Sequence, residues 1–379
     1  NGVIVITTKK GQPGPARWTV SAEYGQTAIP GKYPELMLRF GRDILYGSRV
    51  FCPINNWVGG GWPSNLSNSA TACVPESVES FQILNDPELT VLDQGERSAV
   101  NLGVSGGSSS ITYNLQGTYR DETGLVKLPE YEVERYRTVK GTTPPGWMRR
   151  PQRYRQWSAA ARVNAQLNAK AQASVSANLS RVEQQRSALE SRLGTLMTTY
   201  LDRETGMYYR ANKGVLNIGG GSFEVAEDVM TDYAERAMAT ATQLTSGINV
   251  NWQATSWLTI TSDLGLQIVQ RSDEIFRPTA TPGWSTNDPG SIRVGQGTSV
   301  VNTARVGARA QLPLAWGFRL TLNAGADYTG TTKEDLTASG TGLPEDAESL
   351  NAATNRSVQE GRSDQATYGW FIEPGISHQ

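Results

Sequence analysis

ITYNLQGTY, at residues 111–119, alternates between apolar and polar side chains. One side of an extended chain would carry its apolar members, Ile111, Tyr113, Leu115 and Tyr119. Successive side chains of a β-strand point to opposite faces, so the stretch predicts a strand in a sheet with one apolar and one polar surface. The same alternation recurs along most of the 379 residues, and it therefore decides the fold.

Strands with this pattern come in pairs, and a tight turn joins the members of each pair. The predicted turns lie at 106–109, 168–170, 254–256 and 313–316. Long polar connections are predicted at about 30–95, 121–155, 187–240, 272–299 and 335–362. Short turns at one end and long loops at the other are typical of an outer-membrane barrel. We therefore predict an all-β chain that forms an antiparallel transmembrane β-barrel with long extracellular loops.

The composition is compatible with a barrel and excludes other classes of protein. Lys and Arg number 35 against 36 Asp and Glu, and the resulting net charge of -1 argues against a nucleic-acid binder. Hydrophobic residues make up 38% of the chain, and no run of about 18 apolar residues exists. A helical membrane protein is therefore excluded, whereas a barrel needs apolar residues only at every second strand position.

Histidine and cysteine are scarce. The only histidine, His378, leaves little for a catalytic triad or a histidine-based metal site, so we expect no catalytic, cofactor-binding or metal-binding residues and no enzyme activity. The only cysteines, Cys52 and Cys73, fall within one long polar segment. A disulfide between them would contribute about 3 kcal/mol in an oxidising compartment. Two unrelated free thiols are the alternative.

Charged residues interrupt the polar face of the predicted strands at Arg162, Asp263, Arg305, Arg309, Arg319 and Asp327. In a soluble core each would cost several kcal/mol unless it were paired. In a wide, wet lumen they cost little. They therefore predict that the polar face lines the interior of the barrel and that the apolar face contacts lipid.

Aromatic residues support the same orientation. The rings of Trp252, Trp257, Trp316 and Phe318 flank two tight turns and predict a girdle at the periplasmic membrane interface. A basic and aromatic patch is formed by Arg149, Arg150, Arg153 and Arg155 with Trp147, Tyr154 and Trp157. It could contact anionic lipopolysaccharide or a substrate. We favour the alternative of a solvated loop end whose charges are balanced by Glu130, Glu132 and Glu134.

The first residues, NGVIVITTKKG at 1–11, suggest a family. They resemble a stretch of the SusC/RagA family of TonB-dependent outer-membrane transporters, which closes the plug domain just before the barrel begins. The resemblance implies that 1–12 is the end of a plug and that 16–379 is the N-terminal part of a barrel of about 22 strands. About ten strands can be counted in this chain, so we expect a fragment and an open, curved sheet.

The resemblance also implies a function: import of an oligosaccharide or peptide nutrient across the outer membrane of a Gram-negative-type bacterium. The implied partners are a TonB-type energy-coupling protein, a SusD-like surface lipoprotein, and the surrounding outer-membrane lipid and lipopolysaccharide. The alternative is a structural protein of a surface assembly or filament, whose exposed strand edges pair with other chains. A soluble β-rich enzyme is disfavoured because a second sheet would have to cover the apolar faces.

Overall fold

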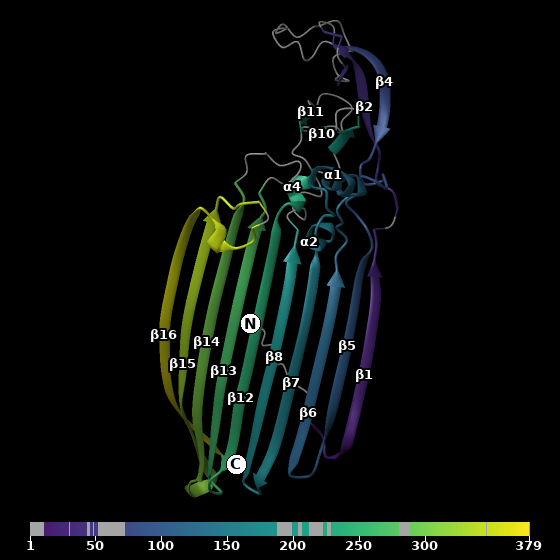
Figure 1. Ribbon diagram of the computed structural model, residues 1–379. Helices are drawn as coiled ribbons and strands as arrows, with labels where there is room; N and C mark the ends of the chain where they lie inside the picture. Colours follow the sequence, from purple (N-terminus) through teal and green to yellow (C-terminus); the bar gives the residue numbers. More distant parts are fainter. Residues whose placement is uncertain are drawn as a thin grey trace, which may run out of the picture.

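The main body of the chain, in a computed structural model, is one antiparallel sheet of ten strands. The structure describes residues 11–29, 31–43, 46–47, 49–51, 73–187, 199–203, 207–211, 223–225, 229–279, 289–345 and 347–378. The strand order is β1-β5-β6-β7-β8-β12-β13-β14-β15-β16, and β1 and β16 form its two edges (Figure 1). The sheet is therefore open, as the strand count predicts.

Strands lengthen along the chain. The first five are β1 (Gly14–Thr27), β5 (Gly95–Gly107), β6 (Ile111–Thr123), β7 (Arg153–Asn168) and β8 (Ala171–Arg186). The last five are β12 (Arg236–Gln253), β13 (Leu258–Arg277), β14 (Ser291–Pro313), β15 (Phe318–Thr341) and β16 (Asn355–His378). A 24-residue strand such as β16 extends about 80 Å, whereas a tilted strand needs about 9–11 residues to cross a bilayer.

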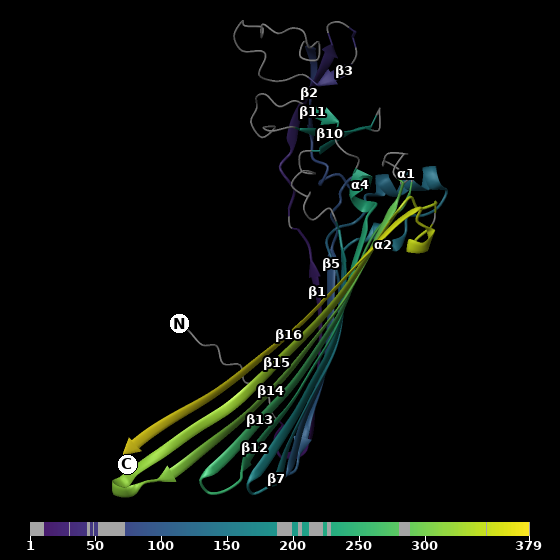
Figure 2. The same ribbon diagram turned by 90° about the vertical axis from the view of Figure 1, so that its left-hand side faces the viewer.

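Small elements gather at one end of the sheet and tight turns at the other (Figures 1 and 2). The connection after β1 holds a second sheet of β2 (Leu36–Asp43), β3 (Arg49–Phe51) and β4 (Cys73–Phe81). The connection after β6 holds the helices α1 (Glu130–Lys140) and α2 (Gly146–Arg149). The connection after β8 holds β9 (Thr199–Asp202), β10 (Met207–Ala211), β11 (Phe223–Val225) and helix α4 (Val229–Tyr233).

The four predicted tight turns are confirmed as hairpins, between β5 and β6, β7 and β8, β12 and β13, and β14 and β15. Polar side chains close three of them. Ser108 Oγ accepts hydrogen bonds from the backbone of Ser110 and Ile111 at 3.2 and 3.1 Å, and Asn168 Oδ1 accepts one from Lys170 at 2.8 Å. Thr255 Oγ1 accepts hydrogen bonds from the backbone N–H groups of Trp257 and Leu258 in the same way. The fourth turn, η4 (Ala315–Gly317), places Trp316 at a φ of 57°.

Two predicted connections are wrong in extent. The expected loop at 272–299 is narrowed because β13 continues to Arg277 and β14 begins at Ser291. The expected loop at 335–362 lies mostly in β15 and β16, and only 342–354, with the turn η5 (Leu350–Ala352), connects them. In the upper parts of these strands, next to the connections, both faces of the sheet are polar. The alternation of apolar and polar residues that predicts a strand therefore disappears there.

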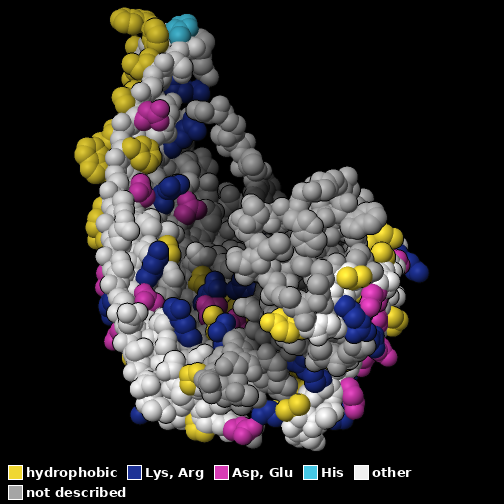
Figure 3. Space-filling model, turned by 90° about the horizontal axis from the view of Figure 1, so that it is seen from above, with side chains coloured by type: hydrophobic (Ala, Val, Ile, Leu, Met, Phe, Trp, Pro, Cys, Tyr) yellow, Lys and Arg dark blue, Asp and Glu magenta, His cyan; other side chains and the backbone are white. Residues whose placement is uncertain are grey.

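The register keeps the apolar residues of all ten strands on one face. Val20 lies opposite Leu102, Leu115 opposite Ala161, and Ile248 opposite Leu264. Seen from above, the wall is curved, with hydrophobic side chains on its outer, convex side and charged side chains on its inner side (Figure 3). Large apolar side chains on that outer face stay exposed; Trp370, for example, is 80% exposed.

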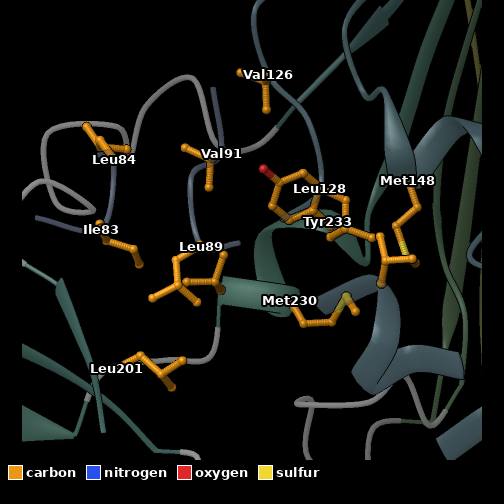
Figure 4. Packing of buried hydrophobic residues seen from close by; sticks show 12 residues of the cluster. Ile83, Leu84, Leu89, Val91, Val126, Leu128, Met148, Leu201, Met230 and Tyr233 are labelled. Carbon is orange, nitrogen blue, oxygen red and sulfur yellow. The ribbon is translucent and has the colours of Figure 1, made fainter. Parts of the chain in front are cut away.

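The largest buried cluster lies above the sheet rather than within it. Residues from three connections converge there, among them Val91, Val126, Met148, Leu201 and Met230 (Figure 4). The hydroxyl of Tyr233 donates a hydrogen bond to the carbonyl of Lys127, which joins two of these connections. In the described residues no helix has the length and apolarity needed to cross a membrane.

Arg236 ties the tops of neighbouring strands together. Its Nη2 lies 2.8 Å from Glu274 Oε1 on β13, and its Nη1 lies 3.0 Å from Glu348 Oε2 in the connection between β15 and β16. The guanidinium carbon also lies 4.9 Å from the centroid of the Phe276 ring. Arg236 thus fixes the connection between β15 and β16 to the upper ends of β12 and β13.

Replacing Met230 by alanine is expected to loosen this upper cluster. Met230 is completely buried, and truncating a buried methionine typically costs about 2–5 kcal/mol. Limited proteolysis should then cut the upper connections at least several times faster while the β-sheet circular dichroism is unchanged. Val139→Ala is the matched control, because Val139 is 63% exposed. Equal cleavage rates in the two variants would show that the cluster does not hold the connections.

Candidate transport surface on the polar face

The polar face of the sheet carries all six charged residues named from the sequence. Asp263, Arg305 and Asp327 are direct cross-strand neighbours on β13, β14 and β15. Asn249 on β12 extends this row, because its Nδ2 donates a hydrogen bond to Asp263 Oδ1. The row therefore alternates negative, positive and negative charge across three strands. Facing opposite charges at such positions typically stabilise a sheet by about 0.2–1 kcal/mol per pair.

The other three charged residues lie apart from this row. Arg309 lies opposite Thr259 and Asn323, which are neutral. Arg319 is closer to the tight-turn end, opposite Pro313 and Ser377. The alternation in the sequence predicts that all six residues share one face, but it does not predict the row, because a register cannot be read from separate strands. Their assignment to a lumen remains a prediction.

Arg162, on β7, lines a polar hollow to which β6, β8 and β12 also contribute. Its Nε donates to Asn164 Oδ1 at 3.2 Å, and Asn164 Nδ2 lies 3.4 Å from Thr112 Oγ1. The hollow has a volume of about 190 Å³, and Ser174 and Asn249 also line it. Hydroxyl and amide groups dominate this lining, so the hollow can exchange hydrogen bonds with water or with a polar chain passing along the wall.

Ion pairs cross the upper part of the wall on both faces. On the polar face, Arg97 on β5 lies 3.9 Å from Glu23 on β1 and 3.3 Å from Glu122 on β6. On the apolar face, Asp121 on β6 lies 3.0 Å from Arg153 and 3.6 Å from Arg155, both on β7. These pairs are partly exposed, so each contributes at most about 1 kcal/mol. These ion pairs lie at the height where the apolar band of the sheet ends and polar residues occupy both faces.

The balancing partners expected for the basic and aromatic patch are wrong. Arg153 and Arg155 pair with Asp121, and Arg150 pairs with Asp93. The carboxylates of α1 instead pair within their own helix, Glu132 with Arg135 and Glu134 with Arg137. Strand register and the i,i+3 spacing of a helix decide these partners, rather than closeness in the sequence. Three of the four arginines are thus paired with carboxylates, but Arg153, Arg155 and Trp157 lie within β7 rather than at a loop end.

Aromatic side chains border the outward apolar face at two levels. Near the tight turns lie the four predicted residues, of which Trp252 is 46% and Trp316 is 89% exposed. Further up lie Tyr119 opposite Trp157, and Tyr328 against Tyr368 with their ring centroids 5.0 Å apart. The eleven residues from Phe318 to Tyr328 extend about 34 Å, or about 26 Å for a strand tilted by about 40°. This height matches the apolar band of about 25 Å in outer-membrane barrels.

Some sequence predictions fall outside the described residues. Cys52 of the predicted disulfide is one, although Cys73 begins β4. The predicted end of a plug at 1–12 is another, apart from Gly11 and Gln12. Within the described ranges, no three His, Cys, Asp or Glu side chains come together as ligands for a metal ion.

Comparison with known proteins identifies the class of fold. No protein-family model matches the chain, and no curated protein does. Among solved structures, the RagAB peptide importer in its closed-closed state is similar over 98% of this chain and 41% of that chain, with a TM-score of 0.60 and 14% identity. Its open-open state gives the same coverages, a TM-score of 0.57 and 12% identity.

These similarities, at such low identity, concern the fold. The ten-stranded sheet is the wall of an antiparallel transmembrane β-barrel with long connections on one side, as the sequence predicts. The chain spans about 41% of the length of the structures that it matches.

Reversing the charge of Arg305 should weaken the wall. Arg305→Glu would place three carboxylates side by side on β13, β14 and β15, whereas Arg309→Glu faces neutral neighbours. We expect the first variant to be less stable than the second by about 1 kcal/mol. Thermal unfolding in detergent, followed by circular dichroism, measures the difference. Equal midpoints would mean that the three residues in the row do not interact.

A positive charge should distinguish the two faces of β14. Val306→Arg places a guanidinium on the outward face, where Val306 is 50% exposed, and Thr303→Arg places one on the polar face. A lipid-facing arginine costs about 2–4 kcal/mol near the middle of a bilayer. Folding yield into lipid vesicles should therefore fall for Val306→Arg and remain near the unchanged protein's for Thr303→Arg. A similar loss in both variants would argue against lipid contact on the outward face.

Proposed function

We propose that the chain is part of a TonB-dependent importer of the SusC/RagA type, which carries an oligosaccharide or a peptide across the outer membrane of a Gram-negative-type bacterium. The observation that carries this proposal is the curved ten-stranded wall, apolar outside and polar inside, in a chain of which 98% aligns with the RagAB peptide importer. The chain acts by binding and guiding its cargo, and no covalent chemistry is involved.

The open edges of the wall support a larger barrel. Neither β1 nor β16 has a second neighbour among the described residues, although β16 is 24 residues long. In lipid every unpaired backbone N–H or C=O costs several kcal/mol, so a stable barrel leaves no edge unpaired. Further strands of the same protein would close the barrel, with 16–379 as its N-terminal part and 1–12 as the end of a plug.

The polar face would be the inner surface of that barrel. Arg162, Asp263, Arg305, Arg309, Arg319 and Asp327 would then line the route of the cargo or hold the plug. The outward band would contact outer-membrane lipid, and the ion pairs above Tyr119 and Trp157 would lie at the level of the lipopolysaccharide head groups. A TonB-type protein would supply the energy from the periplasmic side, and a SusD-like lipoprotein would cover the external side.

A surface assembly built through the strand edges is the second candidate, and the exposed edges of β1 and β16 favour it. The two aromatic levels on the outward face favour the importer instead, because a water-soluble assembly has no use for an apolar band of membrane height.

Energy-dependent uptake tests the proposal. Cells that lack the gene should fail to take up either a peptide mixture or an oligosaccharide mixture that wild-type cells import, and the intact gene should restore uptake. A protonophore should abolish the restored uptake, since a TonB-type partner draws on the gradient across the inner membrane. Unchanged uptake in the deletion strain, for both mixtures, would contradict import as the function.

A further inference from the structure

A cleft lies among the upper connections, beside the main buried cluster. Its volume is about 900 Å³, within the range of ligand-binding pockets. The end of β4, the turn at 82–89 and the residues after β9 form its walls. Ile83, Leu89 and Leu201 form the apolar part of its lining, which we call its floor. Their side chains are exposed by only 3%, 7% and 4%. These three residues belong to the main buried cluster, so the floor is anchored.

The cleft has an excess of negative charge. Four carboxylates line it, those of Glu35, Glu79, Asp86 and Glu88, against the two guanidinium groups of Arg49 and Arg203. Among the described residues of the lining, four negative charges and two positive ones leave a formal charge of -2. Since the whole chain carries only -1, the excess is a local property of this cleft.

Both arginines are already engaged by carboxylates of the cleft. Arg203 reaches Asp86 Oδ2 and Glu88 Oε2, each at 2.9 Å. The hydrogen bond to Glu88 is the main reason why the pKa of Arg203 lies above its usual value. Arg49 lies 3.1 Å from Glu79 Oε1. Glu35 has no ion-pair partner among the described residues, so its carboxylate remains available to a ligand.

Hydrogen bonds hold the backbone just before Glu35. Asn85 accepts a bond from the backbone N–H of Tyr33 and donates one to the Tyr33 carbonyl, both at 2.9 Å. Gln82 donates a bond to the carbonyl of Pro34 at 2.8 Å. The backbone just before Glu35 is therefore fixed to the wall of the cleft, and a ligand would not have to order it.

We propose that this cleft binds a basic side chain, of lysine or arginine, in a peptide at the external face of the importer. The inference rests on the proposed import function and narrows its cargo to peptides with basic residues. The methylene stem of such a side chain can lie beside Ile83 and Leu89 while its charged end meets Glu35, the carboxylate that no described residue pairs with. A neutral sugar gains nothing from the negative charge, and an acidic peptide is repelled by it.

Peptide binding to the purified, full-length protein in lipid nanodiscs tests the proposal. The probes are a labelled hexapeptide with two central lysines, the same peptide with glutamates instead, and maltohexaose. The lysine peptide should bind most tightly, and added salt should weaken its binding because partly exposed charges are screened. Equal affinity for the lysine and glutamate peptides would overturn the proposal.

Three variants connect that binding to the cleft. Glu35→Gln should weaken binding of the lysine peptide by about threefold to fivefold, the value of a partly exposed ion pair. Arg203→Gln should tighten it by a similar factor, because it releases Asp86 and Glu88. Glu360→Gln, on β16, is the control and should change nothing. An unaltered affinity in Glu35→Gln overturns the proposal even if Arg203→Gln does not fold.

Uptake in cells separates this inference from the proposed function. Charge-dependent binding that Glu35→Gln weakens supports the cleft even if the cells import neither peptide nor oligosaccharide, in which case the import function fails alone. Conversely, import that depends on the gene and on energy, but has the same preference for lysine peptides in Glu35→Gln, overturns the cleft and leaves the import function intact.

Discussion

The strand register is the constraint on which the rest of this structure depends. Nine successive pairings keep the apolar side chains of ten strands on one face. A slip of one residue in any pairing would turn every side chain beyond it to the opposite face. The tight turns, closed by Ser108, Asn168 and Thr255, fix the offset between the strands that they join. Short polar turns thus determine which face of the wall is apolar.

A wall of a single layer cannot bury its own apolar face, and this explains where the buried core is found. The outward face keeps residues such as Trp18 and Trp370 exposed by 66% and 80%, as expected for contact with lipid. Among the described residues, the larger core cluster forms above the wall, where three connections fold against one another, and a smaller one packs Leu343 and Ala353 against Phe276 and Ile292 at the ends of β13 and β14. Lipid and loop packing therefore stabilise different parts of one chain, and a change in either part need not affect the other.

The sequence predicts the wall well because alternation records which face meets lipid. The strands, the tight turns and the shared face of the six charged residues follow from it. Where both faces are polar the signal disappears, so the continuation of β15 to Thr341 is missed. The row formed by Asp263, Arg305 and Asp327 depends on register, and the cleft beside Glu35 depends on connections that are distant in sequence. Neither is encoded in a local pattern.

The small sheet of β2, β3 and β4 also affects the chain entropy of forming the wall. Joining β1 to β5 closes a loop of 67 residues, from Thr27 to Gly95, whereas the turn between Gly107 and Ile111 has three. For flexible loops this difference costs about 3 kcal/mol. The pairing of β2 with β4 brings Leu36 opposite Phe81 and so shortens the part that must close freely. The small sheet of β2, β3 and β4 thereby lowers the entropy cost of pairing β1 with β5, the first long-range pairing along the chain.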